Sequence, residues 1–293
     1  MALFISALIV GVSLGTIYGL MAFGMVASYR ISKVVNLGQA GIAAWCASAY
    51  WWMTQVWGAP ILVGLLGALL AGAVLGGAMG FAVLRMKEWP KGLIMIVSLA
   101  ATLLLFSLGD RLLPTYNPQT PSPFGDGGFA VLLTFVSWHE VGTFAVCVGL
   151  ALLMTLVMRR TRFGLFVRAI YDDQDGAATV GIPLTTAVIG VWAASGVLAA
   201  VAGCLATNKT TLDTGLLLFV MVWGLAGAVL GGMESFALGF IGGLVLGIAE
   251  GVVGGTFGGQ LPPGVENLSA IVIMAVGVVY AGTKRRHLAE LQT

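Results

Sequence analysis

Polar side chains are scarce along this chain, and those inside its apolar runs are the first candidates for binding or moving a solute. Asn36 and Gln39 lie in a break, VVNLGQAG, between two charge-free runs. Amides and glycines at a helix start can line a transport cavity, and an interfacial loop with an Asn cap is the alternative. Ser98 and Thr102 lie one helical turn apart, where they either face a pathway or hydrogen-bond only to their own helix.

Two acids, Glu234 and Glu250, flank one short apolar run. An ionisable residue within a membrane segment is a functional candidate by default. The pair predicts either the proton or ion site of a stand-alone carrier or channel, or two span ends at the membrane interface. Uptake driven by an ion gradient, without any ATPase, would favour the carrier.

The segment 159–183 is the most polar part of the chain and reads RRTRFGLFVRAIYDDQDGAATVGIP. Basic residues open it, and acids then precede a run of small residues. This order predicts a short helix with Asp at its N-terminal end. A short polar helix at a membrane surface suits a protein partner, and a solvated loop with the positive charge of a cytoplasmic face is the alternative.

The remaining reactive side chains do not assemble into a catalytic or metal centre. The 3 cysteines lie in apolar runs without a C-x-x-C pair, and the 2 histidines are too few for a zinc site. Ser195 has no deep His that could make it a protease nucleophile. The stretch GVVYAGTK departs from a nucleotide-binding loop. We therefore expect no enzyme activity, no metal and no cofactor in this chain.

The composition decides the class of protein. Of 293 residues, 59% are apolar and 9% are charged, whereas soluble domains are about 25% charged. So few charges exclude a soluble enzyme, a nucleic-acid binder and a disordered chain. We expect an all-α integral membrane protein, a polytopic helical bundle of about nine spans (range about eight to ten) in one transmembrane domain over 1–293. The expected spans are 3–28, 37–57, 61–84, 92–109, 141–158, 184–206, 216–233, 235–249 and 268–283, with a turn at Gly58-Ala59-Pro60.

Basic residues orient the bundle. With the N-terminus outside and the C-terminus in the cytoplasm, every Lys and Arg except Arg111 and Lys209 falls in an inside loop. The uncharged first span is expected to stay in the mature protein, because no positive region precedes it. The outside loop 110–140 is expected to be irregular, with a short helix around Phe129 to Val136.

Glycines recur every fourth position in three places, which we call the glycine ladders. Small residues at this spacing let helix backbones approach closely, so the ladders predict helix packing. The ladders are Gly11, Gly15 and Gly19; Gly72, Gly76 and Gly80; and Gly243, Gly247 and Gly251.

Three blocks resemble the permeases of branched-chain amino acid ABC transporters, of the hydrophobic amino acid uptake type. The family's coupling segment and following span resemble RAIYDDQDGAATVGIPLTTAVIGVWAASGVLAAVAGCLAT. Its glycine-rich hairpin resembles AVLGGMESFALGFIGGLVLGIAEG, and its N-terminal element resembles YRISKVVNLGQAG. The blocks match in order and spacing over nearly the whole chain.

The resemblance implies an importer permease with a fold like that of ribose-class sugar permeases, in a bacterial or archaeal cytoplasmic (inner) membrane. It implies a second, related permease, two ATPase subunits that hold ATP and Mg, and an extracytoplasmic substrate-binding protein; no nucleic acid is involved. The segment 159–183 would be the coupling element that fits a groove on an ATPase. The residues implied for coupling are Arg168, Asp172, Asp173, Asp175, Ala177, Ala178 and Gly181.

Two positions depart from the family pattern. Gln39 stands where a His is expected, and the span around Trp223 lacks the Lys that many members carry. Both fall where a pathway could be lined, so related solutes such as urea or short amides join branched-chain amino acids as candidate substrates. The residues expected along the path are Asn36, Gln39, Ser98, Thr102, Trp223, Glu234 and Glu250.

Overall fold

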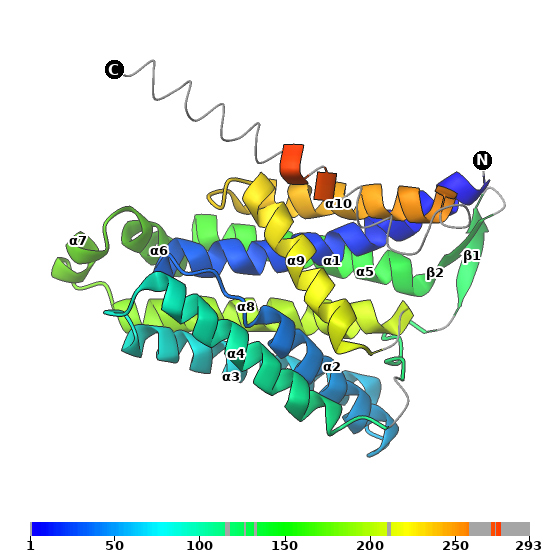
Figure 1. Ribbon diagram of the computed structural model, residues 1–293, viewed down its shortest axis with the longest axis horizontal. Coiled ribbons are helices and arrows are strands. Elements are labelled where there is room, and N and C mark those ends of the chain that lie inside the picture. Colours follow the sequence, from blue (N-terminus) through cyan, green and yellow to red (C-terminus); the bar gives the residue numbers. More distant parts are fainter. Residues whose placement is uncertain are drawn as a thin grey trace.

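The computed structural model describes residues 2–114, 118–125, 127–131, 134–209, 212–257, 271–272 and 274–276. Within these residues the chain is mostly helical, with one small antiparallel hairpin (Figure 1). The helices are α1 (Ala2–Ser32), α2 (Gln39–Gln55), α3 (Ile61–Arg85), α4 (Lys91–Asp110), α5 (Trp138–Arg160), α6 (Arg162–Asp172), α7 (Gln174–Thr179), α8 (Leu184–Lys209), α9 (Thr214–Leu230) and α10 (Phe236–Phe257). The strands are β1 (Gly128–Val131) and β2 (Thr134–Ser137).

Six of the described helices are long and apolar enough to cross a membrane: α1, α3, α4, α5, α8 and α10. Helices α2 and α9 occupy the expected spans 37–57 and 216–233, but each has only 17 residues. Most of the expected span 268–283 lies outside the described residues. A mostly helical bundle with several spans is therefore confirmed, whereas the count of about nine is not.

Two spans form the centre of the bundle and the others surround them. In α8, 72% of the most apolar window is buried, and in α1 44%, against 22% in α3 and α5. The outer helices instead present large side chains such as Leu70, Leu103 and Leu152 at the surface. An apolar surface of this kind suits lipid, because hydrocarbon imposes no penalty on exposed leucine.

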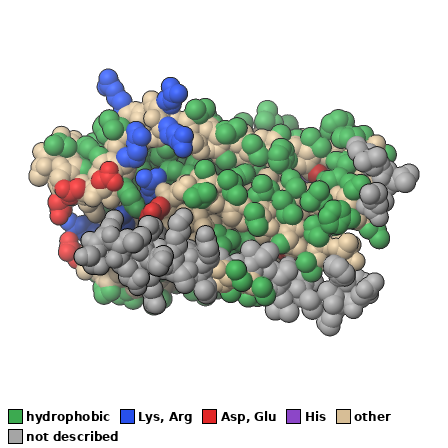
Figure 2. All heavy atoms as spheres, turned by 90° about the horizontal axis from the view of Figure 1, so that it is seen from above, with side chains coloured by type: hydrophobic (Ala, Val, Ile, Leu, Met, Phe, Trp, Pro, Cys, Tyr) green, Lys and Arg blue, Asp and Glu red, His purple; other side chains and the backbone are tan. Residues whose placement is uncertain are grey.

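The bundle has two different ends. Helices α6 and α7 project at the left of Figure 1, together with the end of α1, and the N-terminus and the hairpin lie at the right. The Lys and Arg side chains visible in Figure 2 gather toward the side of α6 and α7. We call this side the charged end and the opposite side the hairpin end.

A β-hairpin replaces the short helix expected around Phe129 to Val136. Val131 pairs with Thr134 in antiparallel register. Along β2, Thr134 and Val136 are buried and Phe135 between them is exposed, which is the period of two of a strand. The expectation of a helix was wrong because a short apolar run is compatible with the period of a helix as well as with that of a strand.

The glycine ladders bring helices into backbone contact. The ladder of α1 packs against the ladder of α10, where a Cβ on Gly15 would lie 2.6 Å from the carbonyl oxygen of Leu244. The ladder of α3 packs against α8, where a Cβ on Gly72 would lie 2.6 Å from the carbonyl oxygen of Gly196. Contacts this close leave no room for any side chain at these two glycines.

Candidate functional site

The break between α1 and α2 buries two amides in the bundle. Asn36 and Gln39 are both fully buried. Asn36 Oδ1 accepts a hydrogen bond from the backbone N–H of Gly38 at 3.0 Å, which forms an Asx turn before α2. From α4, Thr102 donates its hydroxyl to the carbonyl oxygen of Leu37 at 2.8 Å. The break is thus held by its own turn and by a neighbouring span.

Gln39 links three helices. Its Nε2 donates to Ser195 Oγ of α8 at 2.7 Å. On the α1 side, a Cβ on Gly24 would overlap Gln39 Nε2, so this glycine admits the amide. The side chain at position 39 therefore spans the contact between α2, α8 and α1.

Unused hydrogen-bonding capacity remains at three expected path residues. Among the described residues, Asn36 Nδ2, Gln39 Oε1 and Trp223 Nε1 are buried without a hydrogen-bond partner. Trp223 lies on α9 in the same core cluster as Ala40 of α2. A buried polar atom without a partner costs about 1–3 kcal/mol. A polar solute that formed hydrogen bonds with these atoms would recover this free energy.

The two hydroxyl candidates on α4 have different roles. Ser98 donates to the carbonyl oxygen of Met95 within its own helix, at 2.8 Å. Thr102 instead bonds to Leu37 in the break. Ser98 therefore fits the alternative of a hydroxyl that bonds only to its own helix, while Thr102 joins the group around Asn36 and Gln39.

The two acids do not share a site. Tyr18 of α1 donates its hydroxyl to Glu250 Oε2 of α10 at 2.8 Å, across the glycine contact. Glu234 is exposed at the charged end, just before α10. At 1.5 Å per helical residue the two acids lie about 24 Å apart along the helix axis. Glu234 thus fits the alternative of a span end, and Glu250 serves a contact between helices.

The segment 159–183 forms α6 and α7, and the expected short helix with Asp at its start is present. Asp173 caps α7, because its Oδ1 accepts the backbone N–H groups of Asp175 at 3.1 Å and Gly176 at 3.0 Å. After α7 the chain turns at Gly181, whose φ of +82° favours glycine.

The side chains of this segment divide into an anchor and an exposed surface. Ala177 is buried in a cluster that also contains Val188 and Trp192 of α8. Val180 at the tip of the projection is 76% exposed although it is apolar. The other residues implied for coupling are exposed: Arg168, Asp172, Asp173, Asp175, Ala178 and Gly181.

Lys33 packs against the base of the segment. Its Nζ lies 3.4 Å from the ring centroid of Tyr171 in α6. Burial lowers the pKa of Lys33, and the nearby charges of Lys91 and Arg30 lower it further, while Asp172 and Glu234 oppose them. The end of α1 and the segment 159–183 are therefore electrostatically linked.

A polar network at the hairpin end was not found by sequence reasoning. Thr120 bonds to the carbonyl oxygen of Cys204 at 3.1 Å, and Asn208 Nδ2 donates to the carbonyl oxygen of Thr120 at 2.8 Å. Ser122 bonds to His139 Nδ1 at 3.1 Å. The stretch 118–124 is thus fastened to α8 and α5. The signal was the alternation of Pro with Thr and Ser in PQTPSP, since such a stretch has fixed turns and free hydroxyls.

Several helices long and apolar enough to span a membrane, a break between α1 and α2 that buries two amides, and an exposed capped helix at the charged end indicate a polytopic membrane protein. The family model "Branched-chain amino acid transport system / permease component" matches residues 7–281, so the chain belongs to this family and the resemblance is confirmed. The family comprises permease components of ABC transporters, which are transport components rather than enzymes, and it implies ATPase and substrate-binding partners.

A solved structure has a similar fold. The chain resembles a chain of "PsaBC from Streptococcus pneumoniae in complex with Fab" with a TM-score of 0.52, over 94% of this chain and 91% of that chain. At 15% sequence identity the likeness shows the fold alone. No curated protein matches the chain. The family membership does not favour a stand-alone carrier built on Glu234 and Glu250.

Proposed function

We propose that this chain is the path-forming permease of an ATP-driven importer for branched-chain or other hydrophobic amino acids, or for a related small solute such as urea or a short amide. ATP and Mg are held by two ATPase subunits, and a substrate-binding protein delivers the solute from outside. A second, related permease completes the path. The observation that carries the proposal is the projection of α6 and α7 from the charged end, which exposes the apolar side chain of Val180 directly after α7.

The charged end faces the cytoplasm in this proposal. Basic residues are retained on the cytoplasmic side of bacterial membranes, and Arg30, Arg85 and Arg159 all lie at helix ends on this side of the bundle. The N-terminus and the hairpin then lie outside, where the substrate-binding protein docks.

A continuous set of contacts leads from the projection to the buried amides. Ala177 of α7 packs into the cluster at the start of α8. Ser195, further along α8, accepts the hydrogen bond from Gln39 of α2. When the ATPases close on ATP and push α7, α8 moves with it and changes the environment of Gln39. The path then switches sides, because the solute binds one arrangement better than the other.

Co-purification tests the docking surface directly. We expect Val180→Asp to reduce both the recovered ATPase subunits and solute uptake about tenfold, because a charge replaces an apolar anchor at the tip. The variant should fold, since Val180 is 76% exposed. The measurement is the yield of ATPase subunits with the tagged chain in mild detergent, together with uptake in cells.

The matched control is Gln119→Asp, which adds the same charge at an exposed position of the hairpin end. It should leave the recovery of ATPase subunits unchanged. Full recovery and uptake with Val180→Asp would contradict docking through α7. A chain that purifies without any ATPase subunit would contradict the proposed importer as a whole.

A further inference from the structure

A cavity of about 220 Å³ opens at the charged end between α1, α5, α6 and the start of α10. Arg30, Arg159 and Arg168 line it from three different helices, and Glu234 is the acid in its lining. The positive-inside rule explains why arginines occur at this end of the bundle. It does not explain why three of them surround one hollow.

The arginines retain donors for a ligand. Arg30 is held between aromatic rings, with its Cζ 4.7 Å from the Tyr171 centroid and 5.0 Å from the Phe236 centroid. Its buried Nε has no hydrogen-bond partner among the described residues. Within the part of the chain that the structure describes, Arg159 and Arg168 form no ion pair. Guanidinium groups with free N–H groups bind phosphate oxygens in pairs.

The first turn of α10 adds to the positive potential. Ser235, Phe236 and Ala237 all line the cavity. Ser235 Oγ accepts the backbone N–H of Leu238 at 3.3 Å. The earliest N–H groups of a helix have no partner within the helix and carry its positive dipole end, so they favour an anion.

Apolar helix surface continues from the cavity into the membrane-facing part of the bundle. On α5, Leu152 and Leu156 are 60% and 55% exposed, and they precede Arg159 by about two turns and one turn respectively. On α10, Leu238 and Ile241 are 56% and 51% exposed, directly after the residues of the cavity. A free phosphate ion has no apolar part that could pack on this surface, whereas the acyl chains of a lipid would cover it.

We propose that this cavity binds the phosphate of an anionic phospholipid headgroup, with the acyl chains along α5 and α10. The headgroup bridges α6 of the coupling segment to α1, α5 and α10. The proposal needs the charged end to lie at a membrane surface, but it does not depend on the transported solute or on ATPase docking.

The test is lipid binding by the full chain, with any co-purifying subunits, in a neutral detergent. Native mass spectrometry would count bound phosphatidylglycerol against phosphatidylcholine, with inorganic phosphate as a soluble competitor. We expect phosphatidylglycerol to be retained preferentially. Arg159→Gln and Arg168→Gln should each weaken its binding roughly fivefold, as expected for one basic residue near a lipid surface.

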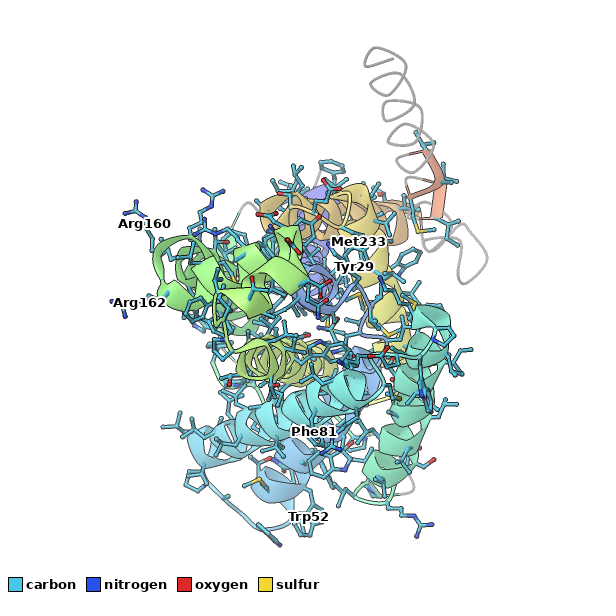
Figure 3. All side chains as sticks on the ribbon, turned by 90° about the vertical axis from the view of Figure 1, so that its left-hand side faces the viewer. Tyr29, Trp52, Phe81, Arg160, Arg162 and Met233 are labelled. Atoms are coloured by element: carbon cyan, nitrogen blue, oxygen red, sulfur yellow. The ribbon has the colours of Figure 1, made fainter. Side chains whose placement is uncertain are left out.

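Arg160→Gln and Arg162→Gln are the matched controls, because both side chains reach outward at the edge of the bundle (Figure 3). They should leave lipid binding within a factor of about two. Equal loss in all four variants would overturn the cavity in favour of diffuse charge attraction. Equal retention of both lipids would overturn the proposal, as would complete displacement by millimolar phosphate, which would make the ligand a free anion. Loss of lipid binding only when an ATPase subunit is present would also overturn it, because the arginines would then serve a protein.

Discussion

Gln39 shows how one buried side chain can connect the resting fold to transport. Its amide nitrogen is satisfied by Ser195, while its amide oxygen has no hydrogen-bond partner among the described residues. Half of its bonding capacity therefore holds α2 to α8, and the other half is unused. Because no water replaces a lost hydrogen bond in the bundle interior, any shift of α8 changes the hydrogen bonding of Gln39.

Removing the hydroxyl of Ser195 should destabilise the bundle. Ser195→Ala leaves the Gln39 amide nitrogen without its 2.7 Å partner, and we expect a loss of roughly 1 kcal/mol in the free energy of unfolding. Ser98→Ala is the control, because that hydroxyl bonds only within its own helix. The measurement is thermal unfolding in detergent micelles. Equal midpoints for the two variants would show that the bond between Gln39 and Ser195 is not stabilising.

At the scale of elements, glycine decides which helices touch. The ladder spacing predicted close packing, but it did not identify the partners, because any small-residue stripe can face any other. The structure pairs α1 with α10 and α3 with α8. Within α3 the contact is selective, since Gly76 faces the backbone of α8 while its neighbour Gly77 faces only side chains of α8, at ordinary contact distance.

Adjacent glycines on α3 should differ in their response to the same substitution. A Cβ on Gly76 would overlap the carbonyl oxygen of Trp192 and lie 3.0 Å from Gly196 Cα. Gly76→Ala should therefore lower the free energy of unfolding by about 1–3 kcal/mol. A Cβ on Gly77 would meet its nearest atoms only at 3.6 and 3.7 Å.

Gly77→Ala should be neutral or stabilising by up to about 1 kcal/mol, since alanine favours helix. Chemical or thermal unfolding of the two purified variants separates them. A Gly76→Ala protein as stable as Gly77→Ala would mean that α3 and α8 are not in backbone contact.

The whole molecule is polarised along the direction of its spans. One end carries α6, α7 and the arginine cavity, and the other carries the hairpin and the network around Thr120. Two positions mark these ends on the surface: Val180 at the charged end is 76% exposed, and Phe135 in the hairpin is 64% exposed. The proposed orientation places them on opposite sides of the membrane.

Cysteine labelling checks this orientation. With a membrane-impermeant maleimide, Val180→Cys should react only from the cytoplasmic side and Phe135→Cys only from outside. The native Cys46, Cys147 and Cys204 are buried and should react slowly. Intact cells and inside-out vesicles provide the two sides. Labelling of both positions from one side would contradict a bundle that presents them at opposite faces.

Local signals in the sequence predicted much of this architecture, and long-range ones did not. The turn at Gly58-Ala59-Pro60 separates α2 from α3 as expected, because Gly and Pro interrupt helices wherever they are placed. Asp173 begins α7 for a similarly local reason. The bond between Thr120 and Thr207 joins residues 87 positions apart, and no pattern in either segment encodes its partner. The pairing of Gln39 with Ser195 was unpredictable for the same reason.

The contact between α1 and α10 also has a genetic consequence. Every single-base change in a glycine codon that alters the residue introduces a larger one, and Gly11, Gly15 and Gly247 face helix backbone at distances that admit none. The lipid-facing leucines of α3 and α5, in contrast, can be exchanged for other apolar residues by one base change. After random mutagenesis and selection for uptake, the glycine stripes of α1 and α10 should therefore keep their sequence, while the residues on the outer surface accumulate substitutions.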